Sequence, residues 1–191
     1  MAISEQRYTS AAVVLHWTIA FLIVVQVFLG WWLNEWVPDH SPIQDKITTV
    51  HISVGLTILL LVLARIAVRL VRRPPPFPAA MPQWERLLAA FSHTVFYIVM
   101  LVLPLSGWAL VSLESDPIQF WGLPWPHLPG VGAIFGSPAP RAVRHALKHF
   151  HVYVMIWIVV ADFALHVAGA LWGQFAGRRT LQRMSLSRAR G

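Results

Sequence analysis

Cysteine is absent from this chain of 191 residues, and charged residues make up only 12% of it. The absence of cysteine excludes structural disulfides, thiolate-ligated iron–sulfur clusters and covalent haem attachment through a C-x-x-C-H motif. Acidic residues are especially few, with eight Asp and Glu against fifteen Lys and Arg. Any redox cofactor must therefore be held without a covalent bond to sulfur.

Apolar residues, by contrast, make up 57% of the sequence, which includes ten Trp and ten Phe. A soluble domain of this size could not bury so much apolar surface, so the composition indicates an integral membrane protein. A helix needs about 20 residues to cross a bilayer. We therefore predict a single all-α membrane domain over residues 1–191, a bundle with four membrane helices at about 11–33, 49–71, 87–110 and 150–172. The first run is too long for a signal-peptide core and should remain in the mature protein.

Basic residues predict the orientation of the bundle. With four crossings, one side of the membrane receives Arg7, Arg65, Arg69, Arg72, Arg73, Arg86, Arg178, Arg179, Arg183, Arg188 and Arg190. The other side receives Lys46, Arg141, Arg144 and Lys148. The positive-inside rule then places both termini in the cytoplasm. Because these charges flank apolar spans, the net charge of +7 reflects topology and does not indicate nucleic-acid binding.

The predicted outer loop, at about residues 111–148, mixes Trp, Phe, Pro and Gly without a helical period. Aromatic residues are enriched where a membrane protein meets the lipid headgroups. We therefore expect this loop to lie at the headgroup level and to cap the bundle from outside.

Four of the nine histidines fall at two matched depths of the predicted bundle. His16 and His166 lie toward the cytoplasmic ends of the first and fourth helices, and His51 and His151 toward the outer ends of the second and fourth. The spacing in the fourth helix corresponds to a rise of about 22 Å and a rotation of about 60°. Both of its imidazoles can therefore face the bundle interior, one in each leaflet.

Such histidines need a partner, because a titratable group in a membrane span costs a few kcal/mol unless something satisfies it. Each one alone could be a core residue bonded to a neighbouring carbonyl, but two separated pairs favour a cofactor. Tetrahedral zinc would need its ligands to converge on one point. Six-coordinate haem iron takes one imidazole above the ring and one below. The pattern therefore predicts two b haems, each between two histidines.

Other residues near these histidines are candidates for cofactor contacts. Arg65 either pairs with haem propionates inside the bundle or snorkels to the interface. Asp162 could hold the N–H of a ligand histidine or belong to a proton path. Small residues on the same faces either leave room for a macrocycle or reflect ordinary close helix packing. They are Ala20, Gly55, Gly169 and Ala170.

The remaining histidines have less defined roles. His93, on the third helix, could contact a propionate or a quinone. His149 competes with His151 as the outer ligand, because residues two apart cannot both face inward on a helix. His145 and His149 have the i, i+4 spacing of a metal pair, but no third ligand lies near them in the sequence, and interfacial exposure explains them better. His40 and His127 look like loop residues.

Four stretches carry a resemblance to a known family: RYTSAAVVLHW, HISVGLTILLLVLARIAVRL, HTVFYIVMLVLPLSGW and HALKHFHVYVMIWIVVADFALHV. Over nearly the whole chain, the sequence resembles the bacterial dihaem cytochrome b561 proteins. The resemblance implies that His16 and His166 bind the inner haem and that His51 and His151 bind the outer one. Some members carry further histidines beyond the last ligand, where this chain has Gly173 and Gln174, so the quinone site stays open.

The resemblance also implies electron transfer across a bacterial inner membrane, with ubiquinone as electron partner. At least one kind of member is a superoxide oxidase, and the four basic residues of the outer side could attract that anion or be ordinary loop charges. Whether the chain is an oxidoreductase or only an electron carrier is left open. One alternative is a cytochrome b anchor and relay for a periplasmic dehydrogenase or reductase. Another is a haem-free transporter, against which the lack of an inverted repeat argues.

Overall fold

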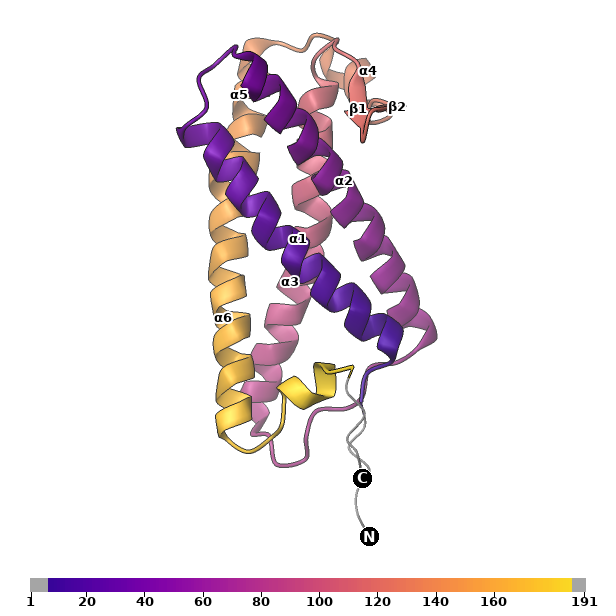
Figure 1. Cartoon of the computed structure of the whole chain (residues 1–191), viewed down its shortest axis with the longest axis vertical. Coiled ribbons are helices and arrows are strands. Elements are labelled where there is room, and N and C mark those ends of the chain that lie inside the picture. Colours follow the sequence, from indigo (N-terminus) through magenta and orange to yellow (C-terminus); the bar gives the residue numbers. More distant parts are fainter. Residues whose placement is uncertain (1–6, 187–191) are drawn as a thin grey trace.

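The structure, a computed structural model, describes residues 7–186 and contains four helices long and apolar enough to cross a membrane. They are α1 (Ser10–Glu35), α2 (Pro42–Val71), α3 (Gln83–Ser112) and a continuous helical segment over Arg141–Phe175. Along the bundle, α1 packs against α2, α2 against α3, and α3 against the last helix (Figure 1). The predicted bundle of four apolar helices is confirmed. Arg188 and Arg190 lie outside the described residues.

Two helices begin at side-chain caps. The hydroxyl of Thr9 accepts a hydrogen bond from the N–H of Ala12 at 3.3 Å, and that of Ser41 accepts one from Gln44 at 3.2 Å. Pro42 follows at the first helical position, where a missing N–H breaks no helical hydrogen bond. Because of this cap, α2 starts well before the apolar run that predicted it.

The fourth crossing is also longer than its apolar run. It consists of α5 (Arg141–His149), a π-helical turn η1 (Phe150–Val154) and α6 (Met155–Phe175). The sequence prediction began at residue 150 because α5 is polar, with Arg and Lys side chains that a hydropathy criterion excludes. Single π-turns inside α-helices are frequent at functional sites, and η1 contains His151.

The connection between α3 and α5 is more regular than the sequence suggested. The strands β1 (Ile118–Phe120) and β2 (Leu123–Trp125) form an antiparallel hairpin, and the short helix α4 (Val131–Phe135) follows. The hairpin lies against α2, where Trp121 donates its backbone N–H to Ser53 Oγ at 3.0 Å and its indole N–H to Thr57 Oγ1 at 3.1 Å. We call this end of the bundle the hairpin end.

The opposite end, which we call the terminal end, holds the start of α1 and the end of α6 (Figure 1). A 3₁₀ turn, η2 (Leu181–Met184), folds back there after α6. The indole N–H of Trp17 donates to the carbonyl of Met184 at 2.8 Å, and Arg183 donates to the carbonyl of Pro76 at 2.6 Å. The segment after α6 therefore ties α1 to the proline-rich connector between α2 and α3.

The buried core is small for a chain of this length. One cluster, Ile19, Val54, Ile58 and Val62, joins α1 to α2, and a second, Val99, Met155 and Val159, joins α3 to α6. Large aromatic side chains point outward instead, with Phe175 84% exposed. On helices of this length and hydropathy, such side chains face lipid. Two helix pairs packed in this way leave space between them at both ends of the bundle.

Candidate cofactor site

A cavity of about 840 Å³ lies toward the hairpin end, and we call it the hairpin cavity. Its lining is mainly apolar and includes His51 from α2 and His151 from η1. The centroids of these two rings lie 6.2 Å apart. The two histidines predicted at the outer level thus face one cavity from different helices.

A second cavity, of about 450 Å³, lies toward the terminal end, and we call it the terminal cavity. It is lined by His16 from α1, His93 from α3 and His166 from α6. The His16 and His166 centroids lie 6.1 Å apart, and those of His93 and His166 lie 5.5 Å apart. Sequence reasoning placed His93 at this level but did not foresee its contact with His166.

The distances between rings test whether a metal-centred cofactor fits. An imidazole nitrogen lies about 2 Å from the metal it binds and about 1 Å from its own ring centroid, so two rings that share a metal have centroids about 6 Å apart. The His51–His151 pair, at 6.2 Å, and the His16–His166 pair, at 6.1 Å, both match this separation. The His93–His166 pair is closer and T-shaped, which is ordinary ring packing.

The surroundings of His51, in the hairpin cavity, give a second test of whether a cofactor fits. Nδ1 of His51 is buried and has no hydrogen-bond partner among residues 7–186. The described side chains and backbone therefore leave this nitrogen unsatisfied. The paired imidazoles and the apolar cavities together fit a flat, iron-centred ring at each level.

The π-turn separates the two histidines that competed for the outer level. His151 lines the hairpin cavity, and its Nδ1 lies 2.9 Å from the hydroxyl of Ser106 on α3. The side chain of His149 is exposed, does not line the cavity and contacts the ring of Tyr153 at 5.3 Å between centroids. Of the two histidines, only His151 faces the cavity.

Two glycines leave room for the imidazole rings that line the hairpin cavity. A Cβ on Gly107 would lie 2.9 Å from Cε1 of His151, and one on Gly30 would lie 3.2 Å from Cε1 of His51. Neither glycine was among the residues singled out from the sequence. Gly55, which was, lines the cavity but also makes room for Gln26, whose Nε2 would be 3.1 Å from its Cβ. At the terminal level, a Cβ on Gly169 would meet nothing within 4 Å.

The wall between the two cavities is made by Ile23, Phe96 and Met100, which line both of them. The ring of Phe96 lies 5.2 Å from that of His166, between centroids. The space between the two pairs of histidines is therefore bounded by apolar side chains.

Two arginines of α2 line the terminal cavity. Arg65 donates a hydrogen bond to the carbonyl of Ala12 at 3.2 Å, and the guanidinium of Arg69 lies over the ring of Tyr97 at 5.4 Å. Arg65 therefore stays at the cavity and bonds to α1, instead of extending into solvent. Its remaining N–H groups can pair with an anionic group of a cofactor.

The buried carboxylate of Asp162 has a partner that sequence reasoning did not identify. The hydroxyl of Ser92 donates to Oδ1 of Asp162 at 2.6 Å, which links α3 to α6. Asp162 is only 6% exposed, and its Oδ2 has no partner among residues 7–186. No hydrogen bond joins Asp162 to a histidine within that range.

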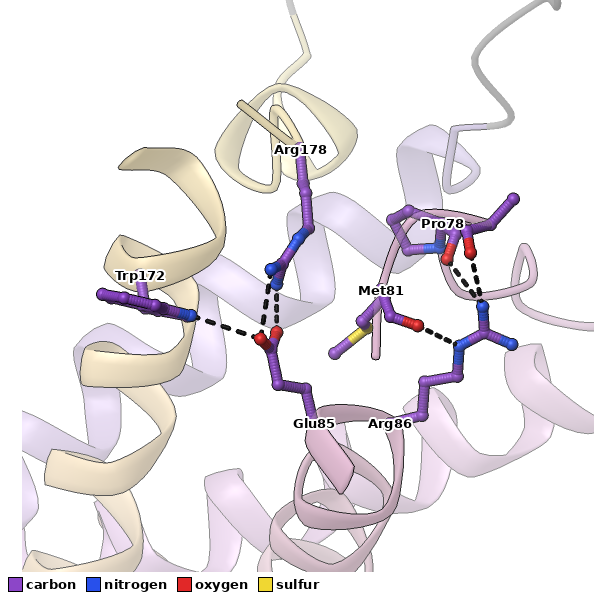
Figure 2. A network of polar contacts seen from close by, with 7 residues as sticks. Pro78, Met81, Glu85, Arg86, Trp172 and Arg178 are labelled. Carbon is purple, nitrogen blue, oxygen red and sulfur yellow. Dashed lines mark hydrogen bonds and ion pairs between the residues drawn. The ribbon is translucent and has the colours of Figure 1, made fainter. Parts of the chain in front are cut away.

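A polar network forms part of the lining of the terminal cavity. Figure 2 shows Arg178 and Trp172 pointing at the carboxylate of Glu85, which lies in the first turn of α3. The guanidinium of Arg178 pairs with both carboxylate oxygens, and the indole N–H of Trp172 donates to Oε1 at 3.3 Å. Arg86 binds the connector at the carbonyls of Pro78, Ala79 and Met81. The contacts of Glu85 with Trp172 and Arg178 join residues far apart in sequence, so no local signal could have revealed them.

The other histidine pair, His145 and His149, does not form a metal centre with a third ligand. Among residues 7–186, no group of three or more His, Asp or Glu side chains is placed to hold a metal ion. His40 and His127 are exposed, as predicted for loop residues.

The fold and the site define a membrane protein whose helices present paired imidazoles to two largely apolar cavities, as a cytochrome with bound haem does. A family model described as prokaryotic cytochrome b561 matches residues 7–185, and the chain belongs to this family. It is therefore a multi-pass bacterial membrane protein of a family that carries b-type haem and transfers electrons across the membrane.

Two curated relatives cover nearly the whole chain. One is cytochrome b561 homolog 2 of Escherichia coli, 26% identical over 183 residues, which are 95% of this chain and 92% of the relative. The other is the probable superoxide oxidase CybB of Yersinia pestis, 25% identical over 185 residues, which are 94% of this chain and 96% of the relative. These identities show relationship across the full length, and the family resemblance found in the sequence is confirmed.

Proposed function

We propose that the protein transfers electrons between a donor at the hairpin end and ubiquinone, with two b haems as its redox groups. The observation that carries this proposal is the pairing of histidines in two separate cavities, at 6.2 Å and 6.1 Å between ring centroids. His51 and His151 would bind one haem, and His16 and His166 the other. A bound haem would supply a centre that accepts and gives up one electron at a time.

Several residues of the chain would hold these groups. Gly30 and Gly107 let the hairpin-level rings approach the cavity, and Gly55 lines it. Arg65 offers N–H donors to an anionic substituent at the terminal level. His93, in contact with His166, is a further polar group at that level, suited to a propionate or to a quinone oxygen.

The proposed orientation has the terminal end in the cytoplasm. Of the Arg and Lys residues in the described chain, nine lie near the terminal end and four near the hairpin end, as counted from their positions. Short segments rich in Lys and Arg stay on the cytoplasmic side of bacterial membranes. The hairpin and α4 would then face the periplasm.

Superoxide is the donor that we propose to test first, because one relative is named as a probable superoxide oxidase. Two superoxide anions would lose one electron each and leave as dioxygen, and one ubiquinone would take up both electrons and two protons to become ubiquinol. Arg141, Arg144 and Lys148 line the hairpin cavity. Arg144 pairs with Glu114 at 2.6 Å, so Arg141 and Lys148, which have no ion-pair partner among residues 7–186, would attract the anion.

The test is to add superoxide to the detergent-purified protein and to monitor reduction of the haem by absorption spectroscopy. An Arg141→Gln/Lys148→Gln double variant should be reduced more slowly, and its rate should depend less on ionic strength than that of the wild type. Lys46→Gln is the matched control, since Lys46 lies at the same end but does not line the cavity. Addition of a short-chain ubiquinone should reoxidise all of these proteins.

The outcomes separate the proposal from its alternative. Reduction by superoxide with reoxidation by ubiquinone supports the proposed function. A protein that exchanges electrons with quinol but not with superoxide would instead indicate a relay for a periplasmic redox partner, which would dock at the hairpin end. A protein without haem would contradict both.

A further inference from the structure

We infer that Ser106 is a positioning residue that fixes the tautomer of His151 and strengthens this imidazole as an iron ligand. The inference rests on the proposed function, in which His151 binds one of the two haems. Ser106 does not line the hairpin cavity, so it would contact neither a bound haem nor a substrate there. Ser106 acts only through the histidine that faces it across the α3–η1 contact.

The direction of the hydrogen bonds follows from counting hydrogens. The hydroxyl of Ser106 lies 2.7 Å from the carbonyl oxygen of Leu103 and 2.9 Å from Nδ1 of His151. A carbonyl has no hydrogen to give, so the single hydroxyl hydrogen is donated to Leu103. The hydrogen between the hydroxyl and the imidazole must then belong to Nδ1 of His151, and the imidazole also has a hydrogen bond with the backbone of Leu103. Nε2 therefore carries the free lone pair that a metal ligand needs.

The helix holds this arrangement in place. Ser106 is only 7% exposed, and its bond to Leu103 stays within one turn of α3, so the hydroxyl has little freedom to turn away. The next residue, Gly107, has no side chain, and a Cβ there would lie 2.9 Å from Cε1 of the same ring. Ser106 thus orients the ring of His151 by a hydrogen bond, and Gly107 leaves room for it. His151 itself belongs to the π-turn η1, which faces α3.

The two histidines of the hairpin cavity, His51 and His151, differ in the hydrogen bonding of Nδ1. Nδ1 of His51 is buried with no hydrogen-bond partner among residues 7–186, whereas Nδ1 of His151 is bonded to Ser106. A hydrogen bond from the remote N–H of a ligand histidine raises the basicity of its coordinating nitrogen. A more basic ligand stabilises oxidised iron more than reduced iron. Ser106 should therefore lower one reduction potential of the protein and leave the other unchanged.

The experiment is a spectroelectrochemical redox titration of the purified, haem-loaded protein, which resolves a midpoint potential for each haem. Ser106→Ala should keep two haems and raise one midpoint potential. Ser106→Thr retains the hydroxyl and should behave as the wild type. Ser112→Ala is the matched control, because this serine also donates within α3, to the carbonyl of Trp108 at 2.7 Å, but contacts the loop at Leu128 instead of a histidine.

The inference is overturned if Ser106→Ala carries two haems with both potentials unchanged, or if Ser112→Ala produces the same shift. If Ser106→Ala loses one haem, a Ser106→Thr variant with normal haem content and potentials supports the role of the hydroxyl. Loss of that haem from Ser106→Thr as well would indicate a purely steric role and overturn the inference. Failure of the proposed function is distinguishable, because His151→Ala would then retain both haems or the wild type would bind fewer than two.

Discussion

A single methyl group added at Gly107 should remove one of the two proposed haems. The new Cβ would lie 2.9 Å from Cε1 of His151. Non-bonded carbons are most favourable at about 3.5–4.0 Å, so the ring would have to retreat by about 0.6 Å or more. Metal–ligand distances vary by only about 0.2 Å, and a displacement about three times larger separates the ligand from its metal.

The assay is the ratio of haem to protein after purification, measured as the pyridine haemochrome. Gly107→Ala should fall from two haems per chain toward one. Gly30→Ala, with a Cβ 3.2 Å from Cε1 of His51, should lose less, because a smaller shift relieves the contact. Gly132→Ala in α4, with an ordinary 3.6 Å contact to Ser137, is the control and should keep both. A Gly107→Ala protein with two haems and an unchanged spectrum would refute the reasoning.

Three further predictions concern stability, the terminal end and orientation. Ser92→Ala, which removes the hydrogen bond to Asp162, should lower the free energy of unfolding in detergent by about 1 kcal/mol; an unchanged value would contradict the link between α3 and α6. Gly173→Ala places a Cβ against Thr180 and should speed tryptic cleavage after Arg178; equal digestion rates would speak against the packing of this segment. Since the chain has no cysteine, an impermeant maleimide should label a His127→Cys variant but not a Pro75→Cys variant in intact spheroplasts; the reverse pattern would overturn the proposed orientation.

Hydropathy alone predicted the four membrane helices, because lipid requires long apolar segments with all backbone hydrogen bonds made internally. The prediction failed where polar residues extend a helix. Helix α5 carries charged side chains, and α2 starts at a cap formed by Ser41, so both begin before their apolar runs. The hairpin was missed because its docking depends on Ser53 and Thr57, which are distant in sequence from Trp121.

The site was predictable to the extent that helical geometry determines it. The rise and rotation per residue were enough to place His151 and His166 at two depths of one helix, facing the interior. Helical spacing left His149 and His151 as alternatives. The family resemblance implied His151, and the structure places His151, but not His149, in the lining of the hairpin cavity. Ser106 was not identified either, because its partner lies on another helix, 45 residues away. Long-range contacts of this kind are fixed only by tertiary packing.

The central claim is that two separate pairs of histidines each hold one b haem. The most direct test is the haem content and reduced-minus-oxidised spectrum of four variants: His16→Ala, His51→Ala, His151→Ala and His166→Ala. His93→Ala and His149→Ala serve as controls. The account predicts two haems per chain in the wild type and in the controls, and the loss of one haem from each of the four variants. A colourless wild type, or full haem content in the four variants, would contradict it.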